Sequence, residues 1–248
     1  MPNLPTHIDL ARQAADRLGH PALAPYVGYF LLGSTSPDVR AMAHGRREDY
    51  HFAPLSFREV GAGIKGLFDA HPRLVTSSEC NGPTRAFVAG YITHLVLDES
   101  WIVEIYRPYF GNPTVFHDEA YGKVMDRALQ LELDRQSHGG VEAALPLLAQ
   151  ARNGVDVGFI SRQTLGDWHR WVLEFVAREF TWDRLRFMAG RIAAGDVGHP
   201  AHRLAGEFLG SMPGSLDDLQ RHVSNVDLAG FRERSVVQIA GAVEDYLS

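Results

Sequence analysis

The chain has very little cysteine, and it lacks any long, uninterrupted hydrophobic run. Cys80 is its only cysteine, which excludes an intramolecular disulfide framework and a zinc site built from several thiolates. Any bound metal must therefore use nitrogen and oxygen ligands. The longest apolar stretches, such as FVAGYITHLVL, are too short and too polar to span a lipid bilayer.

Positive charge is also scarce, because 24 lysines and arginines face 30 aspartates and glutamates, which gives a formal net charge of −6. This balance predicts no general binding to nucleic acid or to an anionic membrane surface, although it leaves room for a local phosphate site. The sequence begins with MPNLPTHIDLARQ, which has neither the basic nor the apolar region of a secretory signal. We therefore expect a cytoplasmic protein.

The sequence motifs of nucleotide-binding loops and of nucleophilic hydrolases are absent. No Gly-Lys-Ser/Thr follows the glycines of GAGIKG, and no Gly-x-Ser-x-Gly motif occurs. Cys80 lies in SSECNGP without a recognisable partner framework. The sequence thus gives no support to a nucleophilic triad.

Apolar residues recur at helical spacing through almost the whole chain, and no run of alternating β-branched residues competes with this pattern. The 248 residues, 45% of them hydrophobic, are enough for a full core. We predict an all-α protein with helices near residues 7–18, 55–70, 84–107, 117–136, 160–179, 182–193, 200–210 and 215–246.

A soft division of the chain falls near residue 137, in the segment SHGG, after which histidines no longer pair with carboxylates at an obvious spacing. We expect residues 1–137 to form a metal-binding helical part and residues 138–248 to form a C-terminal helical part. No linker is long enough to force a boundary, so the two parts are expected to pack as one domain.

The segment AGYITHLVLDESW holds two candidate functional residues, because a histidine and an aspartate interrupt an otherwise apolar helix. His94 and Asp98 are four residues apart and share one helix face. An ionised carboxylate on a buried face is costly unless it is paired or bound to a metal. The pair is therefore either a hydrogen-bonded couple without metal or part of a site for an ion such as Zn²⁺, which accepts imidazole and carboxylate ligands.

Three further residues among the first 51 could join such a site. His7 opens the first predicted helix, and an exposed side chain there is an equally simple interpretation. Asp38 follows Ser36 and Pro37, a pattern typical of a capped helix start that favours a carboxylate in its first turn. His51, in DYHF, is compatible with an ordinary packed or hydrogen-bonded histidine.

Taken in order, the segments THIDLA, LLGSTSPDV, HF and AGYITHLVLDESW resemble the zinc-dependent phospholipase C family, which is related in fold to the S1/P1-type nucleases. The resemblance covers roughly residues 4–107 and implies a multi-helix bundle of that type. It further implies that Asp38, His51 and His94 bind one zinc ion, while Asp98 bridges to a second ion that His7 also holds.

The activity implied by this resemblance is metal-assisted hydrolysis of a phosphate ester. Bound ions polarise the phosphoryl oxygens, and Asp38 is the candidate to orient or deprotonate the attacking water. The substrate class stays open among a phospholipid, a nucleotide and another small molecule. Two other hypotheses remain: an iron or manganese enzyme of redox or lyase type, and a non-catalytic helical protein with a structural metal site.

The sequence departs from the family pattern at two places. Secreted members begin with a tryptophan whose terminal amine and carbonyl bind a metal, whereas Met1 to Thr6 precede His7 here. The histidines and the glutamate of a third zinc site are not found in register. Glu104 and His117 are the candidates for an altered third site, although TVFHDEAYG is equally typical of a solvated helix start.

Overall fold

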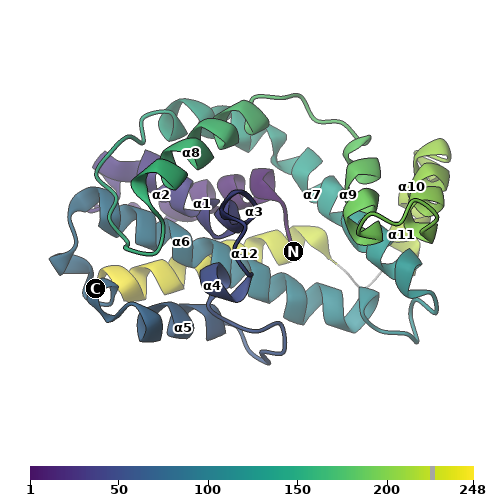
Figure 1. Ribbon diagram of the computed structural model, residues 1–248, viewed down its shortest axis with the longest axis horizontal. Coiled ribbons are helices and arrows are strands. Elements are labelled where there is room, and N and C mark those ends of the chain that lie inside the picture. Colours follow the sequence, from purple (N-terminus) through teal and green to yellow (C-terminus); the bar gives the residue numbers. More distant parts are fainter. Residues whose placement is uncertain (224–226) are drawn as a thin grey trace.

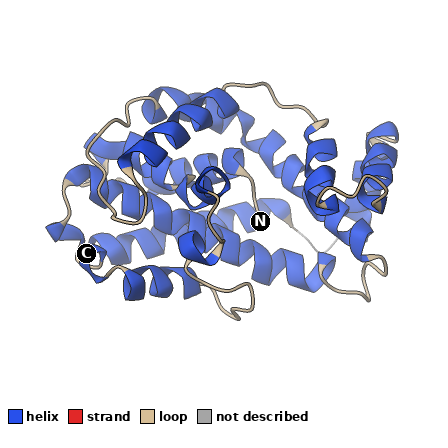
Figure 2. Cartoon of the chain, in the orientation of Figure 1, coloured by secondary structure: helices blue, strands red, loops and turns tan. Residues whose placement is uncertain are grey.

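The computed structural model describes residues 1–223 and 227–248, and every regular element in these ranges is a helix (Figure 2). The predicted all-α class is confirmed. None of the helices in the described ranges is both long and apolar enough to cross a membrane.

The larger helices are α1 (Leu4–Leu18), α2 (Val27–Gly33), α5 (Ala62–Ala70), α6 (Gly82–Ser100), α7 (Glu119–Leu148), α8 (Arg162–Val176), α9 (Arg184–Ala193), α10 (Pro200–Gly210), α11 (Gly214–His222) and α12 (Leu228–Leu247). Shorter helical elements are α3 (Arg40–Ala43), α4 (Glu48–His51), η1 (Ala24–Tyr26), η2 (Ser36–Val39), η3 (Pro72–Leu74) and η4 (Ser77–Glu79). The π-helical segment η5 (Trp101–Phe110) continues α6.

Helix α6 is the centre of the molecule. It is apolar around most of its circumference and is buried from Ala86 to Ser100, as expected of a helix surrounded by others. It contacts α1, α2, α5 and α12, and α12 runs alongside it in Figure 1, whereas α9, α10 and α11 gather at one end of the molecule. The polar residues of α6 therefore lie in the interior.

Helix α7 continues to Leu148, so the predicted helix end at residue 136 is wrong, and the division expected near residue 137 falls within this helix. Gly139 and Gly140 look like a helix stop in the sequence, but Gly140 has a packing role. A Cβ atom at this position would lie 1.8 Å from Oδ1 of Asp9 on α1. The absent side chain lets α1 and α7 approach each other closely.

Two other predicted boundaries also differ from the structure. The helix expected over 215–246 is divided into α11 and α12, and Asp227 caps the second of them by accepting a hydrogen bond from the Gly230 N–H. Helix α5 starts at Ala62 instead of near residue 55, because Gly61 adopts a left-handed conformation with φ of 107° and Glu99 of α6 accepts its N–H. A local cap thus marks the start of α12, and a tertiary contact with α6 marks the start of α5.

The start of α1 is attached to α7 through Asp134. This buried carboxylate accepts hydrogen bonds from Asn3 Nδ2 at 2.9 Å and from Thr6 Oγ1 at 2.8 Å. Burial raises the pKa of Asp134 to about 7, although both hydrogen bonds act in the opposite direction. The contact fixes the first turn of α1, which also carries His7.

The raised pKa of Asp134 predicts a loss of stability with rising pH. An acid whose pKa is higher in the folded protein stabilises the fold at pH values below its pKa in the unfolded chain, which is near 4. This contribution is lost as the pH rises towards 7. Between pH 5 and pH 8 we expect the melting temperature of the wild type to fall more than that of Asp134→Asn. The difference should be roughly 2–4 °C for each kcal/mol of unfolding free energy that ionisation of Asp134 removes. Thermal unfolding at both pH values measures this, and parallel changes in the two proteins would contradict it.

The adjacent glycines of α7 provide a matched test of the close contact with α1. Gly140→Ala would push a methyl group into Asp9, which is held by Arg232 at 2.6 Å, so we expect a loss of about 1–3 kcal/mol in unfolding free energy. Gly139→Ala meets no atom within 4 Å and should gain about 0.5–1 kcal/mol. Denaturant unfolding compares the two, and equal effects would rule out the packing role.

Candidate metal centre

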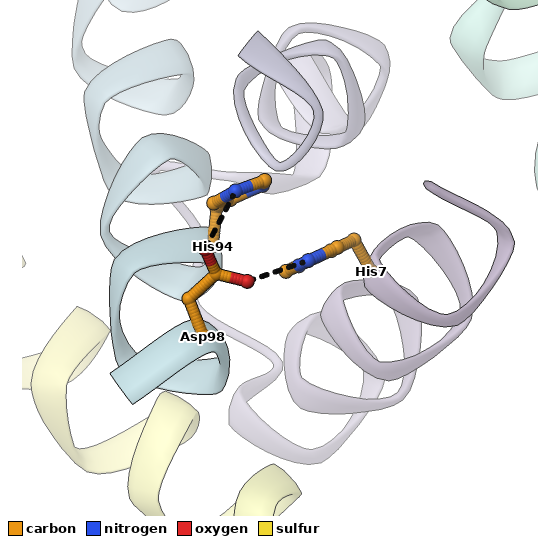
Figure 3. A group of neighbouring side chains, drawn as sticks. All are labelled: His7, His94 and Asp98. Carbon is orange, nitrogen blue, oxygen red and sulfur yellow. Dashed lines mark ion pairs between the residues drawn. The ribbon is translucent and has the colours of Figure 1, made fainter. Parts of the chain in front are cut away.

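Four elements bring the five side chains of the sequence hypothesis together. His7 comes from α1, Asp38 from η2, His51 from α4, and both His94 and Asp98 from α6. In Figure 3, His7 reaches across from α1 towards Asp98, and His94 lies one turn before Asp98 on α6. The cluster therefore joins segments that are far apart in the chain.

Asp98 lies at the middle of this cluster and is almost completely buried. Its Oδ1 is 3.4 Å from Nε2 of His7, and its Oδ2 is 3.2 Å from Nε2 of His51 and 3.6 Å from Nε2 of His94. One carboxylate thus faces the Nε2 atoms of three imidazoles that are themselves buried.

The polar atoms of the cluster lack hydrogen-bond partners in the described chain. These atoms are both oxygens of Asp98, both ring nitrogens of His7 and His51, and Nε2 of His94. Buried polar groups are almost always satisfied, so a set of orphaned lone pairs indicates a missing ligand. Two ligand atoms on a tetrahedral zinc ion, each about 2.0–2.1 Å from it, lie roughly 3.3 Å apart, which matches the spacing around Asp98.

Two overlapping groups of three residues have potential ligand atoms within 4.8 Å of one another. The first group is His7, His94 and Asp98, and the second is Asp38, His51 and His94. Imidazole and carboxylate are the nitrogen and oxygen donors that a chain with a single cysteine can offer to zinc. The residues present therefore fit metal binding.

The orientation of His94 is fixed by the main chain of the segment after α2. Nδ1 of His94 lies 2.8 Å from the carbonyl oxygen of Ser34, so this nitrogen carries a proton, and in the neutral ring the lone pair is on Nε2. Helices α2 and α6 approach closely enough for this bond because Gly33 and Gly90 lie at their crossing. A Cβ atom on Gly33 would be 2.1 Å from the Phe87 oxygen, and one on Gly90 would be 1.8 Å from the Phe30 oxygen.

His51 is held by the short helix α4 and by its neighbours. The hydroxyl of Tyr91 on α6 donates a hydrogen bond to the carbonyl oxygen of Tyr50. Phe52 ends α4 in a left-handed conformation with φ of 56°, which is unusual for a bulky residue, and its ring packs edge-on against that of Phe159. A strained residue beside a clustered histidine is typical of a functional site.

The electrostatics of the metal-free cluster favour an ionised Asp98 carboxylate beside neutral His7 and His51. Burial, together with the nearby His94, lowers the pKa of His7 to about 4, and burial likewise lowers the pKa of His51. Burial also opposes charge on His94, but the Asp98 carboxylate outweighs it and raises the pKa of His94. Burial opposes charge on Asp98 as well, yet the imidazoles hold its pKa well below the ordinary value.

The stacking of two imidazole rings is compatible with a charge on one of them at most. The rings of His7 and His94 lie parallel, within 6°, with centroids 3.8 Å apart. Two positive charges at that separation would repel each other strongly in a buried site. The free lone pairs of neutral imidazoles are the form that binds metal.

Asp38 differs from the other four side chains because it reaches solvent. About 33% of its side chain is exposed, compared with 2% for Asp98. The predicted capping role of Ser36 is wrong, since its hydroxyl donates to the Leu32 carbonyl oxygen. No hydrogen bond from the described part of the chain ends on the Asp38 carboxylate, and its nearest cation is Arg40, at 3.9 Å.

The two candidates for an additional site lie apart from this cluster. Glu104 faces α12, where it contacts Arg234 at 3.3 Å and Gln238 at 3.5 Å. His117 is exposed, and the following Asp118 caps α7 by accepting a hydrogen bond from the Tyr121 N–H. Neither candidate belongs to a group of three potential ligands among the described residues.

Arg47 is a residue of the site that the sequence motifs do not identify. Its Nη2 lies 3.5 Å from Oδ2 of Asp98, and only 10% of its side chain is exposed. The spacing of Arg47 and His51, four residues apart in RREDYHF, places both on one side of a helical turn. That spacing is a local signal, but only the tertiary fold reveals the contact with Asp98.

Comparison with known proteins agrees with these observations. A family model described as zinc dependent phospholipase C matches residues 6–182. No curated protein and no solved structure matches the chain significantly. The matched range includes the five clustered side chains and extends through α7 and α8, beyond the segment that carries the sequence motifs. It covers well over half of the chain, which therefore belongs to the zinc-dependent phospholipase C family.

Proposed function

We propose that this protein hydrolyses a phosphate ester at a centre of two zinc ions held by His7, Asp38, His51, His94 and Asp98. The observation that carries the proposal is the buried Asp98 carboxylate, which faces the Nε2 atoms of three imidazoles at 3.2–3.6 Å while neither of its oxygens receives a hydrogen bond from the described chain. Family membership supports zinc as the metal and a phosphate ester as the substrate.

The chemistry of the donors supports a specific division between the two ions. Nε2 of His94 has one lone pair and can bind one ion only, although it belongs to both groups of three. Asp98 has two oxygens, one towards His7 and one towards His51. Following the resemblance to the family, we propose that Asp38, His51 and His94 would hold one ion, His7 the other, and Asp98 both.

Hydrolysis then requires a group that accepts a proton from water. Bound zinc supplies polarisation of the phosphoryl oxygens and a lower pKa for water. Asp38 is the most exposed of the proposed ligands, and its carboxylate accepts the proton of the attacking water. The new bond forms between the water oxygen and phosphorus, and the bond to the leaving alcohol oxygen breaks. That oxygen takes up a proton from solvent, so a phosphodiester yields an alcohol and a phosphomonoester.

A lipid phosphodiester is the substrate class that the family description favours. Nucleotides and other small phosphate esters form the second class to be tested, because the net charge of −6 disfavours large polyanions more than small ones. The cytoplasmic location and the lack of general nucleic-acid binding stay predictions.

The proposed centre predicts which substitutions remove metal. His94→Ala and Asp98→Ala should each lose most of the bound metal, because His94 belongs to both groups and Asp98 faces His7 with one oxygen and His51 with the other. His7→Ala should lose about one ion of two, because it contributes to only one group. Elemental analysis of protein purified without added metal measures both the stoichiometry and the identity of the metal.

His138→Ala is a suitable control for this experiment. His138 also faces an acid four residues later, Glu142 at 3.5 Å, but the two side chains are 42% and 70% exposed and should not affect metal content. Full metal content in both His94→Ala and Asp98→Ala would place the centre elsewhere. Iron or manganese in the wild type would redirect the function towards redox or lyase chemistry, and a single ion would contradict the two-ion centre.

The role assigned to Asp38 predicts a loss of turnover without an equal loss of metal. Asp38→Asn keeps an oxygen ligand but removes the basic carboxylate, so we expect turnover to fall by roughly two to four orders of magnitude. Hydrolysis of phosphatidylcholine and of a chromogenic phosphodiester, with metal analysis of the same samples, measures this.

Asp183→Asn is the control for Asp38→Asn, since its side chain is 78% exposed and lies beside Arg186 on α9. The control should hydrolyse as the wild type does. Wild-type turnover in Asp38→Asn would leave Asp38 as a metal ligand only. A zinc-loaded wild type that is inert on every phosphate ester would overturn the hydrolase proposal itself.

A further inference from the structure

A guanidinium group lies directly against the buried carboxylate of the metal centre. Arg47 precedes the first residue of α4, and its Nη2 is 3.5 Å from Oδ2 of Asp98. The same Asp98 oxygen faces His51 at 3.2 Å. Arg47 is thus as close to Asp98 as the three imidazoles are.

Only part of the hydrogen-bonding capacity of this guanidinium is used. Nη1 donates to the carbonyl oxygen of Ala53 at 3.1 Å, which anchors one side of the planar group. Nη2 donates to Sδ of Met1 at 3.4 Å, and a thioether is only a weak acceptor. Nε is buried and donates to no atom of the described chain. Nε and Nη2 share one edge of a guanidinium, and such an edge can donate two parallel hydrogen bonds to one oxyanion.

The charges of the site also favour an anion beside Arg47. The proposed ligands carry only two negative charges, those of Asp38 and Asp98, when their imidazoles are neutral. Two zinc ions bring four positive charges, and the guanidinium of Arg47 is permanently charged as well. A cation at this position repels the metal that the site is built to hold, and a bound phosphate would relieve that repulsion.

We propose that Arg47 binds the non-bridging oxygens of the substrate's phosphoryl group through its Nε and Nη2 edge. This assignment rests on the proposed phosphate ester hydrolysis and names a group that would hold the reacting phosphoryl next to the metal ligands. The alternative is that Arg47 only holds Asp98 in place, in which case its loss would act through the metal.

The experiment measures phosphate binding separately from activity. Zinc-loaded wild type, Arg47→Gln and Arg47→Lys are titrated with inorganic phosphate by calorimetry, with zinc content measured on the same samples. We expect Arg47→Gln to bind phosphate about 10- to 100-fold more weakly while keeping its zinc, because two charge-assisted hydrogen bonds are lost. Arg47→Lys keeps the charge without the planar edge and should weaken binding by about 3- to 10-fold.

Arg232→Gln is the matched control. Arg232 is similarly buried, with 16% of its side chain exposed, and pairs with a buried carboxylate at 2.6 Å, that of Asp9. Because it contacts none of the proposed ligands, its replacement should leave phosphate binding unchanged in protein that remains folded.

Two outcomes would overturn the proposal: phosphate binding equal to wild type in Arg47→Gln, or a parallel loss of zinc and phosphate binding. Should Arg47→Gln fail to fold, Arg47→Lys decides the question by the same two measurements. The wild type could also prove inert on every ester while its Arg47 variants still bind phosphate more weakly. That result would support the anion site and refute the proposed hydrolysis, so failure of one proposal can be told from failure of the other.

Discussion

An ionised carboxylate in a protein interior is stable only when neighbouring groups compensate its charge, and Asp98 imposes this condition on the centre of the molecule. Its position on the most enclosed helix removes water as a partner. Compensation must therefore come from α1 and from the α4 segment, which supply His7, His51 and Arg47. The side chains that join these elements to α6 are therefore also the side chains of the candidate metal site.

Contacts outside the cluster reinforce this arrangement. Asp134 of α7 fixes the first turn of α1, and the carbonyl oxygen of Ser34 fixes the ring of His94. Helix α8 contacts η2, where the Trp168 indole N–H donates to the Thr35 hydroxyl at 3.1 Å. The element η2, which carries Asp38, thereby contacts both α6 and α8, while the Asp38 carboxylate stays partly open to solvent.

The sequence predicts features that depend on local spacing and misses those that depend on distant contacts. The shared face of His94 and Asp98 follows from helical periodicity, and the ordered motifs predict the family. The continuation of α7 through Gly140 could not be predicted, because the reason for that glycine lies on α1. Arg47 was missed for the same reason, since nothing in RREDYHF shows that Asp98 will lie beside it.

The bond between His94 and the Ser34 carbonyl has a consequence for how this centre can evolve. The acceptor belongs to the main chain, so every amino acid at position 34 would offer the same oxygen to the imidazole. The side chain at this position is restricted only by its burial and by the hydrogen bond from the Ser34 hydroxyl to the Leu31 carbonyl oxygen. The vulnerable positions are instead Gly33 and Gly90, where a single added methyl group would separate two helices. The strictest constraint on this centre thus falls on two residues that have no side chain to offer a metal.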